Sequence, residues 1–184
     1  MLRTLVCVGA LSALSLMTPL AQAPPAGDET ARLNAWFEAK FKEQLAFSPI
    51  QQTFLGQASS EIDDLSIAAQ DQQLAWRRAS AAQLRQSFDY ARLSPEAQTS
   101  YDVWLYQLEQ AEAATRFRTN AYIFDQMSAI HSFLPQLLIA FHRVDTVSDM
   151  AGYLNRIRES GRALRQLIEI SKTNATTGVR PPRF

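Results

Sequence analysis

Apolar residues recur at helical spacing along most of the chain, and strand-like alternation is nearly absent. The clearest pattern begins at Ser94-Pro95-Glu96, which offers an N-cap hydroxyl, a proline for the first helical position and an acid for the first turn. This pattern predicts a helix from Pro95 to about Arg118. The residues that mark its apolar face are Ala97, Tyr101, Trp104, Leu105, Leu108, Ala111 and Thr115.

Other stretches of the chain carry similar signals. Apolar spacing predicts helices over residues 29–47, 49–55 and 65–90, with Gly56 as the C-cap of the second and a polar loop at 57–64. A last helix is expected to begin after Thr146, where Asp149 completes a variant of the capping box, and to end at 176–178. Its apolar stripe contains Met150, Tyr153, Leu154, Ile157, Gly161, Leu164 and Ile168.

Residues 120–144 form an apolar stretch of low charge that Pro135 interrupts. We expect an irregular entry at 121–124 and then short buried helices on either side of the proline. Gln126, His131 and Gln136 lie within this stretch, and buried polar side chains need hydrogen-bond partners. Two interpretations remain open: these three residues are satisfied parts of a core, or they line a ligand cleft. We take them as candidate cleft-lining residues.

The fold class expected is all-α, an antiparallel array of about five or six helices. The chain divides into a leader at 1–23, a short linker at 24–28, the helical part at 29–178 and an extended tail at 179–184. The tail ends on an apolar residue after Pro181-Pro182, as a chain cut before its next helix would. We therefore expect an incomplete domain.

The first 23 residues have the features of a signal peptide. Arg3 supplies the positive charge, residues 5–17 the apolar run, and Ala21-Gln22-Ala23 the small-residue cleavage site. These features predict export to the periplasm or the extracellular space, with no membrane contact beyond the leader. Pro24 follows the expected cut and usually blocks the peptidase, so another cleavage position is also open. An uncleaved anchor and a cytoplasmic protein with an apolar start are the alternatives to export. The single cysteine, Cys7, lies in this leader, so the mature chain has no disulfide framework.

The remaining residues offer little catalytic chemistry. Lys plus Arg and Asp plus Glu both number 18, so no net charge attracts nucleic acid. The two histidines, His131 and His142, are eleven residues apart, or roughly 16 Å along a helix, which is too far to share a metal ion. The sequence therefore predicts no catalytic residue, no metal ligand and no cofactor in this chain. Both Asp63-Asp64 and Glu109 with Glu112 are most simply solvated charges, and the same holds for the arginines at 156, 158, 162 and 165. His142 is interpreted as a partner of a helix C-terminus.

A series of short motifs in a fixed order resembles the bacterial family called domain of unknown function 885. The motifs are Leu33-Asn34-Ala35-Trp36-Phe37, Ser48-Pro49, Leu55-Gly56, Leu93-Ser94-Pro95-Glu96, Tyr101-Asp102, Leu108-Glu109, Leu134-Pro135-Gln136, Tyr153-Leu154, Arg156-Ile157, Gly178-Val179 and Pro181-Pro182-Arg183. The resemblance implies a longer exported protein that looks like a zinc metallopeptidase, with a His-Glu-x-x-His helix in its C-terminal part. That motif is absent here, so no catalytic residue carries over, and zinc is implied only for the full-length family.

Two hypotheses follow from these observations. In the first, the chain is the N-terminal helical part of an exported metallopeptidase-like protein. It is inactive alone, its partner is the missing C-terminal part of the same protein, and a peptide is a possible substrate. In the second, the chain is a self-contained periplasmic helical binding or scaffold protein.

Overall fold

The computed structural model describes residues 26–125 and 129–181, and these residues contain helices and no strand. The predicted all-α fold class is thus confirmed. The α-helices of this part of the chain are α1 (Ala26–Leu45), α2 (Pro49–Phe54), α3 (Ile67–Ser87), α4 (Pro95–Thr115), α5 (Ile130–Gln136) and α6 (Val147–Thr176). Two short 3-10 helices, η1 (Tyr90–Arg92) and η2 (Arg118–Asn120), and a π-helix, η3 (Leu137–Phe141), complete them.

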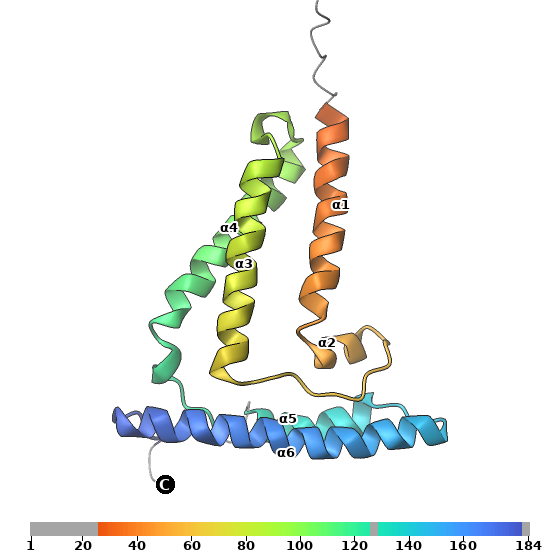
Figure 1. The fold of residues 1–184 in the computed structure, drawn as a ribbon, viewed down its shortest axis with the longest axis vertical. Helices are drawn as coiled ribbons and strands as arrows, with labels where there is room; N and C mark the ends of the chain where they lie inside the picture. Colours follow the sequence, from red (N-terminus) through yellow and green to blue (C-terminus); the bar gives the residue numbers. More distant parts are fainter. Residues whose placement is uncertain (1–25, 126–128, 182–184) are drawn as a thin grey trace, which may run out of the picture.

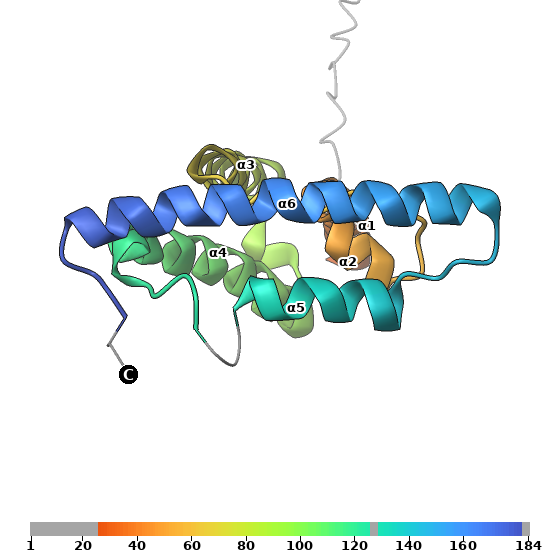
Figure 2. The ribbon, with the colours of Figure 1, turned by 90° about the horizontal axis from the view of Figure 1, so that it is seen from below.

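The helices form two groups that run crosswise to each other (Figure 1). Helices α1, α3 and α4 stand side by side and alternate in direction, as predicted for an antiparallel array. Helices α5 and α6 lie across the end of this group, and seen from below they run side by side in opposite directions (Figure 2). The long α6 therefore forms a base on which α2 and the first group rest.

Each group has its own hydrophobic core. In the upright group the buried cluster joins α1 through Leu33 to α3 and α4, with Trp36, Phe37, Trp104 and Leu105 packed against it. In the base a second cluster contains Ile50, Ile62, Leu134, Leu137 and Ala163, so α2, α5, η3 and α6 share one core. A third cluster, formed by Leu74, Ala81 and Leu108, lies between α3 and α4, so none of the three clusters joins the upright helices to α6.

Side-chain caps set the helix starts where the sequence predicts them. The Ser94 hydroxyl accepts a hydrogen bond from the backbone N–H of Ala97 at the start of α4 (3.3 Å). The Thr146 hydroxyl and the Asp149 carboxylate form the predicted capping box of α6. Gly56 follows α2 with φ of +74°, a left-handed conformation that suits glycine and confirms it at this helix end.

Asp63 differs from the solvated charge that the sequence indicates. Its carboxylate accepts hydrogen bonds from the Ser48 hydroxyl (2.7 Å) and from the backbone N–H of Ile50 (2.9 Å). It therefore secures the first turn of α2 from a distance in sequence, and it is partly buried in doing so. A cap supplied from another segment leaves no local motif, which is why the prediction failed.

Several helix boundaries also differ from the expected ones. Helix α1 begins at Ala26, inside the stretch expected to be a linker, and α3 is shorter than predicted at both ends. Pro135 lies inside α5 and does not separate two helices, so that prediction was wrong. The proline falls in the second turn, where its ring removes a single helical donor. The chain then continues into η3, which closes with a bond from the His142 N–H to the Leu137 carbonyl (3.0 Å).

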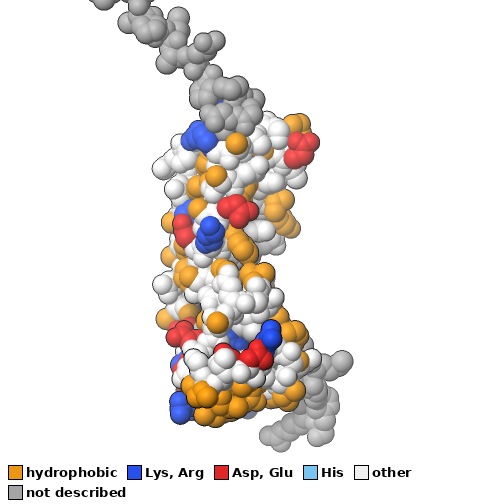
Figure 3. Space-filling view, turned by 90° about the vertical axis from the view of Figure 1, so that its right-hand side faces the viewer, with side chains coloured by type: hydrophobic (Ala, Val, Ile, Leu, Met, Phe, Trp, Pro, Cys, Tyr) orange, Lys and Arg blue, Asp and Glu red, His pale blue; other side chains and the backbone are white. Residues whose placement is uncertain are grey.

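Helix α6 buries the face that carries Arg156 and exposes much of the apolar stripe that the sequence predicts to be buried. The residues buried on its inner side are Arg156, Ala163, Ile170 and Asn174, which recur at helical spacing. The large apolar residues exposed on the opposite side are Val147, Met150, Leu154, Ile157 and Ile168. We call these five residues the outer apolar face. Figure 3 shows hydrophobic side chains gathered at the end of the molecule that α5 and α6 form.

The irregular segment 57–66 crosses from α2 to α3 along α6, and side chains of α6 bind its backbone. Asn155 donates to the carbonyl of Ser60 (2.9 Å), and Arg162 donates to the carbonyl of Ile62 (2.7 Å). The Gln166 side-chain oxygen accepts from the N–H of Leu65 (3.1 Å). These bonds hold the segment against the base although it has no regular structure.

Among the described residues, no helix combines the length and the apolar character that crossing a bilayer requires.

Candidate functional site: a pocket around a buried arginine

The structure places the three candidate cleft residues as follows. Gln126 lies outside the described residues. His131 and Gln136 are both exposed on α5, and the His131 ring contacts Phe124 with 5.5 Å between ring centroids. Neither His131 nor Gln136 lines the pocket described below. Their assignment to a cleft therefore stays a prediction.

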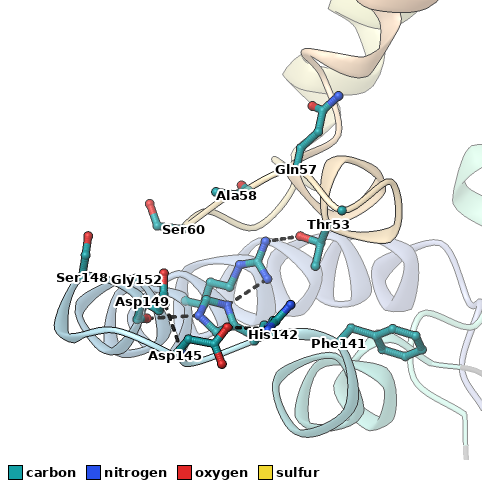
Figure 4. Close-up of a pocket in the computed structure, with 14 residues that line it drawn as sticks. Thr53, Gln57, Ala58, Ser60, Phe141, His142, Asp145, Ser148, Asp149 and Gly152 are labelled. Carbon is teal, nitrogen blue, oxygen red and sulfur yellow. Dashed lines mark hydrogen bonds and ion pairs between the residues drawn. The ribbon is translucent and has the colours of Figure 1, made fainter.

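A pocket of about 540 Å³ lies where α2, the segment after it and the first turns of α6 meet. Figure 4 shows its walls: Thr53 of α2 and residues 57–60 on one side, and residues 141–152 on the other. The complete lining is Thr53, Gly56, Gln57, Ala58, Ser59, Ser60, Phe141, His142, Arg143, Asp145, Ser148, Asp149, Gly152 and Arg156. Because Arg156 is the largest fully buried side chain of the described chain, we call this cavity the Arg156 pocket.

The Arg156 guanidinium joins three elements of the fold. One terminal nitrogen, Nη2, donates to the Thr53 hydroxyl of α2. The other, Nη1, lies 3.1 Å from Nδ1 of His142, just after η3. The third nitrogen, Nε, is buried and has no hydrogen-bond partner in the described part of the protein. Dashed lines in Figure 4 mark the contacts at Thr53 and His142.

This geometry determines the tautomer of His142. A guanidinium has only donors, so Nδ1 of His142 must be the acceptor and carry no proton. Nε2 lies 3.2 Å from the carbonyl oxygen of Asp149, which can only accept, so the ring proton is on Nε2. The His142 ring therefore links Arg156 to the first turn of α6. His142 sits at the end of η3 as expected, where its backbone N–H donates to the Leu137 carbonyl (3.0 Å), while its ring contacts Arg156 and the Asp149 carbonyl.

The charge of Arg156 is not balanced by a close acid. Burial lowers the pKa of Arg156 below the ordinary arginine value, and the more distant Asp63 carboxylate acts in the opposite direction. Within the described residues no carboxylate lies in ion-pair range of the guanidinium, and Asp63 is already bonded to α2. Arg156 thus remains a cation among neutral acceptors.

Two carboxylates stand at the rim of the pocket, and both are engaged. Asp149 accepts from the backbone N–H groups of Thr146 (2.8 Å) and Asp145 (3.0 Å). The hydrogen bonds from Thr146, and then that from the Asp145 backbone, hold the pKa of Asp149 below its usual value. Asp145 pairs with Arg143 on the exposed surface. The carboxylates therefore stabilise the start of α6 and leave the buried guanidinium uncompensated.

Sequence reasoning missed Arg156 because it treated the arginines of α6 as one solvated group. The structure separates them: Arg158 and Arg165 are exposed, whereas Arg156 has no exposed surface. A signal was present in the spacing, since Arg156 lies seven residues before Ala163 and fourteen before Ile170, all on one helix face. The choice of the broader apolar stripe as the buried face concealed it.

A second hollow lies between α3, η2 and α6, with a volume of about 800 Å³. Leu74 and Ile170 line its apolar part, and the ion pair between Arg118 and Asp71 (2.8 Å) stands at its edge. It contains no unpartnered buried polar atom among the described residues. It therefore gives less basis for inferring a ligand than the Arg156 pocket.

The described residues do not fit a zinc site. Zinc in hydrolytic sites takes three protein ligands from His, Cys, Asp or Glu. No such group of three comes together in the part of the chain that the structure describes. His142, which lines the Arg156 pocket with Asp145 and Asp149, already uses both ring nitrogens.

Comparison with known proteins gives one match. Residues 49–184 match the model of a family described as bacterial protein of unknown function (DUF885). No curated protein and no solved structure shows a significant match. The matched range contains α2 to α6 and all residues that line the Arg156 pocket.

Proposed function

This chain belongs to the family of bacterial proteins of unknown function DUF885, and we propose that it forms one wall of the substrate cleft of an exported, metallopeptidase-like protein. It contributes shape and binding groups, and it supplies no metal ligand. The export part rests on the signal-peptide features of residues 1–23. The metallopeptidase part rests on the ordered motifs that resemble the family.

The outer apolar face is the observation that carries this proposal. Val147 is 90% exposed, and Met150, Leu154 and Ile157 are each almost half exposed, all on one side of α6. Soluble proteins rarely leave a row of large apolar side chains open to water unless another surface covers it. We infer that a further part of the same exported protein packs on this face and that the cleft lies at their junction.

A self-contained binding protein is the second candidate, and the Arg156 pocket favours it. The described residues already line this pocket with a buried cation, which is what a protein that binds a small anion by itself would need. In that case the outer apolar face contacts a separate partner or a second copy.

Export and metal content test the first proposal. The complete chain, with its leader, is expressed in a bacterial host and followed by cell fractionation, with a Leu11→Asp/Leu14→Asp variant as the matched control. We expect the wild type in the periplasm or medium, shortened by removal of the leader, and the control in the cytoplasm. A wild type that stays in the cytoplasm contradicts export.

The purified exported protein is then analysed for bound zinc and for hydrolysis of unstructured peptides. We expect neither stoichiometric zinc nor peptide turnover. One tightly bound zinc per chain would show that the chain supplies a metal site after all. Cooperative unfolding without dye binding would favour the self-contained alternative.

A further inference from the structure

We propose that the Arg156 pocket is a carboxylate-binding site in which the Arg156 guanidinium is the counter-ion. The proposal uses only residues of this chain and does not depend on the proposed function. It rests on the combination of a fully buried cation, an unpartnered Nε–H and an adjoining cavity of about 540 Å³. A buried charge without a partner is costly, and a ligand anion would remove that cost.

The free donor and its neighbour have the geometry that a carboxylate requires. A carboxylate can bind a guanidinium side-on, through Nε–H and the Nη–H beside it, in two parallel hydrogen bonds. In this protein Nε has no partner, and Nη2 donates to the neutral Thr53 hydroxyl. A ligand carboxylate that displaces this hydroxyl would complete the pair. The Thr53 hydroxyl would still have a hydrogen-bond partner after displacement, because it donates to the Pro49 carbonyl (3.0 Å).

The other groups of the pocket favour a singly charged anion. Asp145 and Asp149 stand at the rim, and their negative charges oppose a doubly charged phosphate more than a carboxylate. Ser148 lies in the first turn of α6, where backbone N–H groups lack helical partners. The His142 ring is held between the Arg156 guanidinium and the Asp149 carbonyl, so it forms a fixed part of the wall.

The ligand can enter on the side of segment 56–60. A Cβ built on Gly56 would meet no atom within 4 Å, so this edge is open. Farther along the same segment, a Cβ on Gly152 would lie 3.4 Å from Cβ of Ser60 and 3.7 Å from Cε1 of His142, so α6 is in ordinary van der Waals contact with Ser60 there. Arg156 itself has no exposed surface, so binding requires Thr53 and the adjoining segment to move aside.

The test compares acetyl-trialanine with a free C-terminus, its C-terminal amide and inorganic phosphate, each titrated into the purified protein. The Arg156 Nε–H resonance in a nitrogen-15 spectrum reports contact, and calorimetry gives the affinity. We expect the free acid to shift this resonance saturably, and the amide and phosphate to bind at least about tenfold more weakly. Equal binding of the acid and the amide would overturn the proposal, and so would the absence of any saturable shift up to about 10 mM peptide.

Variants assign the effect to Arg156. Arg156→Met should abolish binding of the free acid, whereas Arg158→Met removes the same charge from an exposed site on α6 and should leave it unchanged. Thr53→Val keeps the guanidinium but removes the competing hydroxyl, so it should tighten binding several-fold if it acts as proposed. Unchanged affinity in Arg156→Met, or weaker binding in Thr53→Val with an intact fold, would refute the assignment.

Discussion

Substitution of the outer apolar face provides the sharpest test of how α6 is oriented. Leu154→Ser/Ile157→Ser replaces two side chains that are each 48% exposed. Full burial of a leucine or isoleucine contributes about 1.5–3 kcal/mol, so half-buried side chains contribute about 1 kcal/mol each. We therefore expect the double variant to lower the free energy of unfolding by about 2 kcal/mol. It should remain folded, because the free energy of unfolding of a domain is about 5–15 kcal/mol.

Two control substitutions provide the scale for this loss of stability. Leu137→Ala removes a side chain with 0% exposure from the core of the base, and a single substitution there should cost about 2–5 kcal/mol. Val103→Ser changes an apolar side chain of α4 that is 47% exposed but lies outside the outer apolar face. It should lower the free energy of unfolding by about as much as either single substitution on α6.

Urea unfolding followed by circular dichroism measures the stability, and fluorescence of a hydrophobic dye measures the exposed apolar surface. We expect the double variant to bind clearly less dye than the wild type, and Val103→Ser to bind as much as the wild type. If the double variant lowers the free energy of unfolding by about 4–10 kcal/mol, the cost of two core truncations like Leu137→Ala, these side chains are buried and the described orientation of α6 is wrong. Undiminished dye binding would show that the exposed apolar surface lies elsewhere.

Three further predictions concern α6 and the upright core. Gly161→Ala should raise the free energy of unfolding by about 1 kcal/mol, because the added Cβ meets only Arg165 Nη1 at 3.6 Å and alanine is the better helix former. Chemical denaturation measures this change, and a lower free energy of unfolding would show that Gly161 has no room for a side chain. Leu84→Ala, at 0% exposure, should cost about 2–5 kcal/mol in the same assay, and a cost below that of Val103→Ser would contradict its place in the core. The lowered pKa of Asp149 means that its cap contributes stability above the carboxyl's unfolded pKa and loses it as the pH falls through the lower folded value. The stability gap between wild type and Asp149→Asn, measured by urea unfolding at several pH values, should therefore narrow below about pH 4, and a gap that widens there would refute the capping role.

The sequence was sufficient to predict the fold class and several helix starts. Ser94 and the pair of Thr146 and Asp149 are local signals, because a cap lies next to the N–H groups that it satisfies. Gly56 is equally local, since its left-handed conformation ends α2 within the same turn. Such features can be recognised from neighbouring residues alone.

The orientation of α6 and the residues of the Arg156 pocket could not be predicted from neighbouring residues. Helical spacing shows which residues share a face, but it does not show which of two faces is covered when both carry apolar side chains. Here the inner face holds Arg156, and the partners that settle its burial, Thr53 and His142, come from other segments. The cap that Asp63 provides for α2 has the same origin in distant residues. Tertiary contacts of this kind leave no local pattern.

The attachment of segment 57–66 to α6 has a consequence for how this region can change over evolutionary time. Asn155 and Arg162 bind carbonyl oxygens of Ser60 and Ile62, groups that every amino acid carries. Replacement of most side chains in the segment would therefore leave its anchoring intact, whereas insertion or deletion of one residue would move each carbonyl away from its donor. We expect this connection to tolerate variation in identity and to resist variation in length, the reverse of what is usual for a loop without regular structure.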